Sequence, residues 1–167
     1  MSLSEALADL SATVVAFLAA AARTGGQWKI PRAPGKWSPS QVAEHVARIM
    51  EESAKVAAGS PSKFPTIPIF LRPVVRLIVF RRIIRRKSFL KMKALEPFQP
   101  EMGVGSPSEA MTRLQATLAQ FDSACRAREA TGRKVDSTIF GAVSVADFAR
   151  FQELHVRHHL QQLPGEE

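Results

Sequence analysis

The chain has 167 residues, a length that suits one domain with a sizeable hydrophobic core. Hydrophobic residues make up 46% and charged residues 23%, as in soluble globular domains, so we expect residues 1–167 to form a single domain. One cysteine, Cys125, excludes an internal disulfide framework. The acidic N-terminal segment MSLSEALADL lacks the basic start of a signal peptide, and together these features predict a cytoplasmic protein.

The net charge of +8 is unevenly distributed. Nine Lys or Arg residues and no acidic residue lie between Arg72 and Lys93. Subtracting these nine charges from the total of eight leaves −1 for the remainder of the chain. The basic character therefore belongs to residues 72–93, called the basic segment below.

Four segments carry apolar residues at three- and four-residue steps, the spacing of helices that face a core. Each begins with a serine that is followed three residues later by Glu, Gln or Asp, the capping-box pattern that marks a helix start. In chain order these pairs are Ser2–Glu5, Ser38–Gln41, Ser106–Glu109 and Ser144–Asp147. The expected ends are before Gly25, near Gly59, before Gly132 and at Pro164. Period-two alternation is scarce, so no sheet is expected, and the pattern predicts an all-α four-helix bundle.

The connection over residues 59–105 contains the basic segment, which we expect to form an extra helix between the second and third long helices. On that helix Pro73, Leu77, Phe80 and Ile84 form a stripe free of charge. The segment is too interrupted by arginines to span a membrane.

Several roles are open to the basic segment. We favour packing across the bundle or a dimer partner with the arginines in solvent. Contact with an anionic membrane surface and attraction of an anionic substrate are alternatives. Specific nucleic-acid binding is not expected, because no groove-reading motif or aromatic platform accompanies the charge.

Three of the four histidines fall on inward-facing stripes. His155 and His159 are one helical turn apart on the face that carries Phe148 and Phe151, and His45 lies on the inward face of the second helix. Imidazoles at this spacing can bind one cation side by side, which would satisfy several buried nitrogens at once. A lone inward histidine is more often a hydrogen-bonded core residue, so spacing alone leaves both alternatives open.

Other polar residues lie close to these histidines in sequence. His158 falls at the edge of the apolar face of its helix. Helical geometry points Glu44 and Glu153 away from the histidines, and we interpret both as surface charges. Gln152 and Gln162 share the inward face, either as partners of the ligands and substrate or as residues at the rim of the bundle.

Two further side chains receive structural interpretations. Cys125 lies on the apolar stripe of the third helix, where a free cysteine is usually a small buried hydrophobe, and nothing nearby would lower its pKa. Trp37 is expected to pack at the start of the second helix.

Two motifs support a family resemblance. The segment GKWSPSQVAEHV, residues 35–46, resembles the W-S-x-x-x-x-x-x-H-L motif of DinB-like (YfiT-like) proteins. Residues 140–144 followed by residues 155–163 are similar to the last helix of that superfamily. The motifs come in the expected order, and the resemblance spans nearly the whole chain outside the basic segment. It implies a four-helix bundle with up-down-down-up connectivity in which His45, His155 and His159 bind one divalent ion, zinc or nickel being favoured.

The resemblance also implies an activity. Some DinB-like proteins are S-transferases or isomerases that use a low-molecular-weight thiol, and others are described as hydrolases. We therefore expect a metal-dependent transferase or hydrolase that acts on a small-molecule substrate, with a thiol as a candidate cosubstrate. The alternative is a non-catalytic, metal-stabilised binding module that contacts a membrane surface through the basic segment. A homodimer is compatible with either hypothesis.

Overall fold

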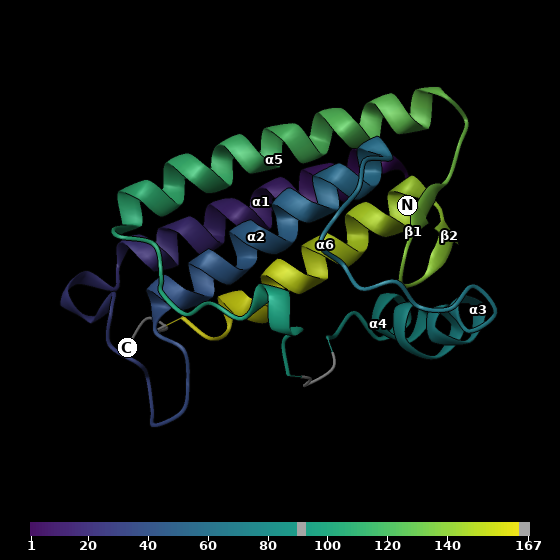
Figure 1. Ribbon diagram of the computed structural model, residues 1–167. Helices are drawn as coiled ribbons and strands as arrows, with labels where there is room; N and C mark the ends of the chain where they lie inside the picture. The colour runs from purple at the N-terminus through teal and green to yellow at the C-terminus, as the bar shows by residue number, and fades with distance from the viewer. Residues whose placement is uncertain (90–92, 164–167) are drawn as a thin grey trace.

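The computed structural model describes residues 1–89 and 93–163 and is mostly helical, in agreement with the all-α expectation (Figure 1). Four long helices lie side by side: α1 (Leu3–Ala22), α2 (Pro39–Ala58), α5 (Pro107–Ala130) and α6 (Val145–Leu160). The shorter helical elements are η1 (Gly25–Gln27), α3 (Arg72–Val75), η2 (Arg76–Phe80), α4 (Arg81–Arg86) and η3 (Glu96–Phe98). Pro164, the expected end of the last helix, lies outside the described residues, and α6 ends at Leu160.

The four long helices begin where the serine pattern predicts. At Ser2 and Ser38 the capping box is complete, with the serine side chain and the residue three positions later bonding to each other's backbone N–H. At Ser106 and Ser144 the hydroxyl accepts the backbone N–H of the third helical residue, at 3.1 Å in both cases. Gly59 ends α2 in the left-handed conformation, with a φ of 80°, which glycine adopts without steric cost.

The long helices pack in two main pairs. α1 packs most extensively against α6, and α2 packs against α5. α1 also contacts α5, and α2 contacts α6, so the apolar faces of all four helices meet in one core. Fully buried side chains at these contacts include Leu10, Phe17, Val46, Leu114 and Phe121.

In the described part of the chain, α1 alone has the length and mean hydropathy, 20 residues and 1.6, that a membrane-crossing helix requires. Core helices pass the same test. The packing of α1 against α5 and α6 accounts for its apolar composition.

The expectation that the chain forms no sheet is wrong in one place. β1 (Val135–Ser137) and β2 (Gly141–Val143) form a two-stranded antiparallel hairpin between α5 and α6. Val135 pairs with Val143, and both are buried. Strands of three residues are too short to show an alternating pattern in the sequence.

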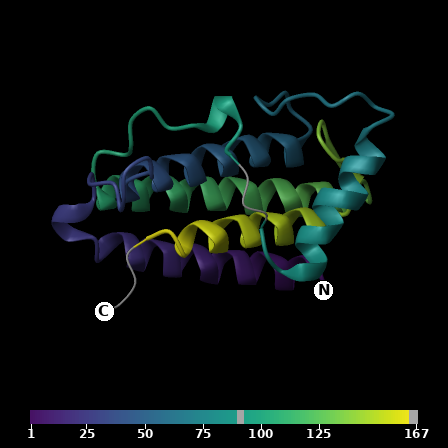
Figure 2. The ribbon, with the colours of Figure 1, turned by 90° about the horizontal axis from the view of Figure 1, so that it is seen from below.

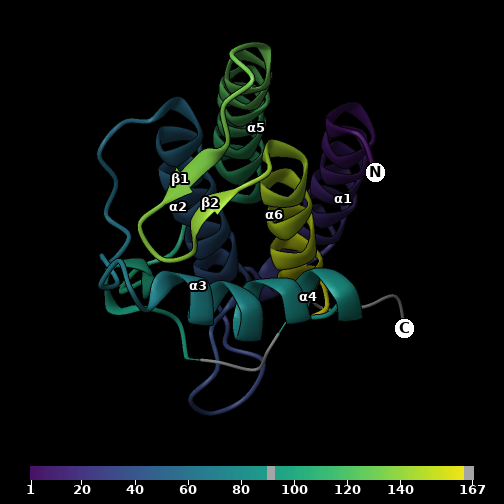
Figure 3. The ribbon, with the colours of Figure 1, turned by 90° about the vertical axis from the view of Figure 1, so that its right-hand side faces the viewer.

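An extra helix was expected from about Arg72 to Lys93, and the structure forms it over residues 72–86 only, as α3, a π-helical turn in η2, and α4. It ends at Lys87, which adopts the left-handed conformation. It lies across the outside of the long helices, in front of α2 and α6 in Figure 3, and is seen from another side in Figure 2. Phe80 stacks on Phe151 and contacts Phe140, each at a centroid distance of 5.1 Å, and Ile83 is 1% exposed. The inner face of this helix is therefore part of the core.

The prediction that the charge-free stripe packs on the bundle holds for Phe80, which is buried, but is wrong for Leu77, which is 61% exposed. Arg72 and Arg76 occupy the packed face instead. Their guanidinium groups donate to the backbone carbonyls of Ile67 (2.9 Å) and Ala142 (2.6 Å), while their aliphatic stems pack on the protein. The expectation that the arginines are all in solvent is wrong for these two, which are half-buried, whereas Leu77 lies on the outer side.

Candidate metal centre

Three histidines from two helices converge in the core. His45 comes from α2, and His155 and His159 come from α6. The Nε2 atom of His155 lies 3.3 Å from Nε2 of His45 and 3.2 Å from Nε2 of His159. All three side chains are buried, with exposures of 4% to 6%. Their candidate ligand atoms lie within 4.8 Å of one another, so the cluster could hold a metal ion.

Hydrogen bonds at the outer nitrogens fix the tautomers of two rings. Nδ1 of His45 lies 2.7 Å from the carbonyl oxygen of Phe98, and Nδ1 of His159 lies 3.0 Å from Oε1 of Gln162. Both oxygens can only accept, so each Nδ1 carries the proton and donates it. In the neutral ring the other nitrogen is then unprotonated. His45 and His159 therefore both direct an Nε2 lone pair at His155.

His155 cannot satisfy both lone pairs. Its Nε2 carries at most one proton, and its buried Nδ1 has no hydrogen-bond partner among the described residues. Either tautomer leaves a buried polar nitrogen unpaired, which is costly in the absence of a further partner. A cation among the three Nε2 atoms would accept all three lone pairs and leave Nδ1 protonated.

The spacing of the nitrogens also fits a metal ion. Zinc–nitrogen bonds of about 2.0–2.1 Å in a tetrahedral site place neighbouring ligand nitrogens roughly 3.3 Å apart. Two of the three Nε2 separations, those from His155, match this value at 3.3 and 3.2 Å, and all three ligand atoms lie within 4.8 Å of one another. In addition, metal-ligating histidines commonly donate their other N–H to a carbonyl or carboxylate, as His45 and His159 do here.

Burial keeps these imidazoles neutral. Desolvation lowers the pKa of His45 below 6.5, and the positive charge of Arg48 contributes to this shift, while the Phe98 carbonyl opposes it. Desolvation, followed by the proximity of His45, lowers the pKa of His159 to about 3. The pKa of His155 is well below 6.5 for the same reason, with His159 as the next cause. Neutral imidazole is the form that binds metal, so no proton has to be displaced at neutral pH.

Two aromatic rings cover the cluster. The Trp37 ring lies 4.9 Å from that of His45 and stacks on His159 at 6.4 Å. The Phe89 ring, at the end of the basic segment, meets the edge of His155 at 5.3 Å. Trp37 does stand just before α2, as expected, but its contact with the histidines was not expected. The position of Trp37 in the W-S motif could have indicated this contact, whereas no sequence pattern indicated the contact of Phe89.

The polar residues of the inward face have different roles. Gln162 Oε1 accepts a hydrogen bond from His159 Nδ1, which agrees with the first of its two alternatives, a partner of a ligand, and its Nε2 lies 3.2 Å from His158. Gln152 is buried and donates to Ser53 Oγ at 2.8 Å, while its Oε1 has no partner among the described residues. His158 is half-buried and does not belong to the three-histidine group.

The interpretation of Glu153 as a surface charge is wrong, because its side chain is fully buried. It does point away from the histidines, but α1 packs on that side of α6. There its carboxylate accepts a hydrogen bond from Thr13 Oγ1 at 3.1 Å and pairs with Arg150 at 2.9 Å and with Arg157. The carboxylate therefore joins α1 to α6 electrostatically, and the structure gives it no contact with the histidine cluster.

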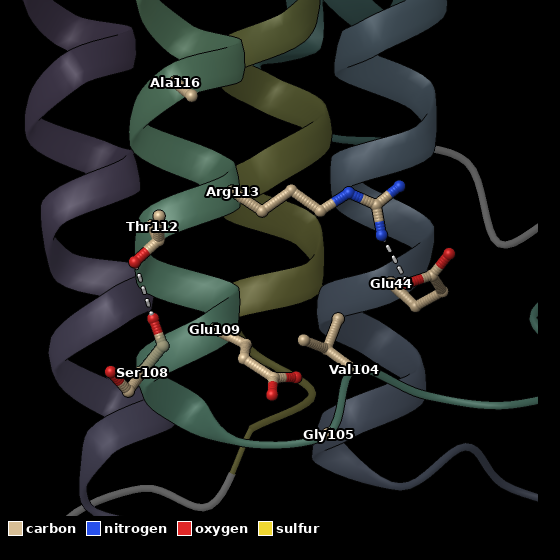
Figure 4. Close-up of a pocket in the computed structure, with 8 residues that line it drawn as sticks. All are labelled: Glu44, Val104, Gly105, Ser108, Glu109, Thr112, Arg113 and Ala116. Atoms are coloured by element: carbon tan, nitrogen blue, oxygen red, sulfur yellow. Dashed lines mark hydrogen bonds and ion pairs between the residues drawn. The ribbon is translucent and has the colours of Figure 1, made fainter.

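The same correction applies to Glu44, which is 9% exposed and pairs with Arg48 and Arg113 at 2.5 Å each. Arg113 also binds Glu51, and these carboxylates raise its pKa. A surface pocket of about 600 Å³ opens beside this ion pair (Figure 4). It is lined by Glu44, Val104, Gly105, Ser108, Glu109, Thr112, Arg113 and Ala116. None of these is a histidine, so this pocket is separate from the metal centre.

Cys125 is a core residue, as interpreted from the sequence. Its side chain is fully buried on α5. Burial, and secondarily the negative charge of Asp122, raise the pKa of the thiol to about 12. It therefore remains protonated and poorly nucleophilic at neutral pH.

Fold and site together define a mostly helical protein with a buried three-histidine cluster that could hold a metal ion. Residues 6–165 match the family described as "Protein of unknown function (DUF1569)", and the chain therefore belongs to this family. No match was found among curated proteins or among solved structures.

Proposed function

We propose that the chain binds one divalent metal ion through His45, His155 and His159 and uses it to catalyse a reaction of a small molecule. The favoured reaction types are thiol-dependent S-transfer and hydrolysis. One observation carries the metal site: two Nε2 lone pairs, fixed by carbonyl acceptors behind them, point at a third imidazole that cannot satisfy both. Three imidazole ligands suit zinc or nickel.

We also propose that this family is a branch of the DinB-like superfamily, folded as a four-helix bundle with up-down-down-up connectivity. The course of the long helices supports this: α1 and α6 run in one direction in Figure 1, and α2 and α5 run in the other. The long connection between α2 and α5, residues 59–106, is what two parallel consecutive helices require. The tryptophan and the histidine of the W-S motif, Trp37 and His45, also lie in contact, with ring centroids 4.9 Å apart.

Catalysis requires an open coordination position. Among the described residues no fourth His, Cys, Asp or Glu joins the three histidines, so an ion held by them would keep a coordination position for water or a substrate atom. A bound divalent ion would supply a Lewis acid for water or a thiol. The chain itself orients the rings of His45 and His159 through Phe98 and Gln162. Trp37 and Phe89 place aromatic rings against the histidines, where they would line the approach of a substrate.

The second candidate is a non-catalytic module in which the metal stabilises the fold. The low exposure of the three histidines, 4% to 6%, favours it, because structural sites are closed to solvent.

Elemental analysis of protein purified without an affinity tag tests the metal site. We expect about one divalent ion per chain, and its loss in His45→Ala and His159→Ala. His158→Ala is the matched control, because His158 neighbours the cluster without belonging to it, and it should retain the ion. Equal metal loss in every histidine variant would contradict the assignment.

A screen of small thiols and electrophiles separates the enzyme from the module. Activity should require the ion, disappear in His155→Ala and persist in Cys125→Ala, because the Cys125 thiol is buried and protonated. Activity that survived chelation and vanished with Cys125 would overturn the mechanism. A fully metal-loaded protein that is inactive across the panel would favour the structural module.

A further inference from the structure

The turn before the helix of residues 72–86, called the basic helix, and the outward face of the first half of that helix are apolar. The described part of the chain has twelve large exposed hydrophobic side chains, and half of them fall within residues 69–78. They are Ile69 (76%), Phe70 (74%), Leu71 (42%), Val74 (50%), Leu77 (61%) and Ile78 (59%). From Phe70 onwards they follow the three- and four-residue spacing of one helix face. We call this set the apolar patch.

The second half of the same face is basic. Arg81, Arg82 and Arg85 continue the helical spacing of the apolar patch, and Arg86 and Lys87 follow, all exposed. No acidic residue occurs anywhere in residues 53–95 of the sequence. The inner face is already occupied, since Phe80 and Ile83 pack on the core. Within residues 1–89 and 93–163, the outer face thus combines exposed hydrophobic side chains with basic side chains that form no ion pair.

We propose that this face binds an anionic lipid bilayer surface, with the helix of residues 72–86 lying in the plane of the interface. Interfacial helices bury their apolar side chains about 5–10 Å into the headgroup region, while their basic side chains remain at the level of the lipid phosphates. Here the apolar patch provides the inserted surface, and the five basic residues at positions 81, 82 and 85–87 provide the contacts with phosphate. The helix is fixed to α6 and the hairpin, so binding needs no folding step.

Charge favours a bilayer over a second copy of the chain. A dimer formed through this face would bury ten basic side chains, five from each copy. Neither copy offers an acidic residue on the face to neutralise them. An anionic membrane supplies negative charge along the whole face, together with an apolar layer for the patch.

Vesicle cosedimentation with the full, tag-free chain tests the proposal. The probes are phosphatidylcholine vesicles and vesicles of equal parts phosphatidylcholine and phosphatidylglycerol. The chain should bind the anionic vesicles alone, and binding should weaken with added salt. Phe70→Ser/Leu77→Ser removes apolar contacts and Arg82→Glu/Arg85→Glu reverses charge; each should weaken binding by about tenfold or more.

Matched controls change equally exposed residues elsewhere. Val15→Ser/Ile30→Ser and Arg133→Glu/Lys134→Glu should bind vesicles as the wild type does. Far-ultraviolet circular dichroism, measured in every variant, verifies the helical fold and keeps this test independent of the proposed metal site. The proposal is overturned if the chain binds no anionic vesicle, or if the control variants lose binding equally. It is also overturned if light scattering finds a dimer that Phe70→Ser/Leu77→Ser separates into monomers.

Discussion

The buried, neutral state of His159 should make the metal-free protein acid-sensitive. In the folded chain its pKa is lowered from 6.5 to about 3, chiefly by burial. A histidine whose folded pKa is depressed stabilises the fold above pH 6.5. This contribution is lost as the pH falls from 6.5 towards 3, because the imidazole is then protonated in the unfolded chain but remains neutral in the folded chain.

The size of the effect follows from the two pKa values. At pH 5 the unfolded imidazole is almost fully protonated, while the folded one is almost fully neutral. The free energy of unfolding should therefore fall by about 2 kcal/mol for this group alone between pH 7.5 and pH 5. His45 and His155 are shifted in the same direction and add to the loss.

Urea unfolding of chelated protein at pH 7.5 and pH 5 measures this loss. His159→Leu keeps a buried side chain of similar size without a titrating group, so its loss should be smaller than that of the wild type by about 2 kcal/mol or more. Gln161→Leu, an exposed and non-titrating neighbour, should behave as the wild type. The same pH dependence in His159→Leu and the wild type would refute the argument that the folded state holds His159 neutral.

Two further variants probe the surroundings of the centre. Gln162→Leu removes the acceptor of the His159 hydrogen bond and should weaken metal affinity about 10- to 100-fold in a chelator competition. The control Gln161→Leu should keep the wild-type affinity. Equal affinities in the two variants would show that this hydrogen bond does not orient the ligand. Glu153→Gln removes the buried carboxylate that pairs with Arg150 and Arg157, and it should lower the free energy of unfolding, measured in urea, by about 3 kcal/mol. Glu129→Gln, at an exposed position, should keep the wild-type stability. Wild-type stability in Glu153→Gln would contradict the role of the buried ion pairs.

Helix starts and the pairing of His155 with His159 were predictable because both depend on local geometry. A serine cap and the residue three positions later are in contact wherever a helix begins, as at Ser2 and Ser38. The i, i+4 spacing alone places His155 beside His159. His45 could be assigned to an inward face, but its distance from the other two depends on how α2 packs against α6.

The surroundings of the site could not be predicted, because they depend on where the connections run. Helical geometry correctly pointed Glu153 away from the histidines, yet it could not show that Thr13 of α1 lies on that side. Phe89 reaches His155 only because the basic helix crosses α6. The packed positions of Arg72 and Arg76 likewise involve hydrogen bonds to the carbonyls of Ile67 and Ala142, tertiary contacts that a hydrophobicity pattern does not contain.

The place of Trp37 gives the centre an optical reporter. The chain contains no tyrosine and two tryptophans, so excitation at wavelengths that phenylalanine does not absorb reports on Trp28 and Trp37. The Trp37 ring is 4.9 Å from that of His45, within reach of quenching by an ion with unpaired d electrons. Zinc has a filled d shell and would leave the emission bright, whereas nickel or copper would darken it. Emission intensity can therefore distinguish between ions that the three imidazole ligands accept alike.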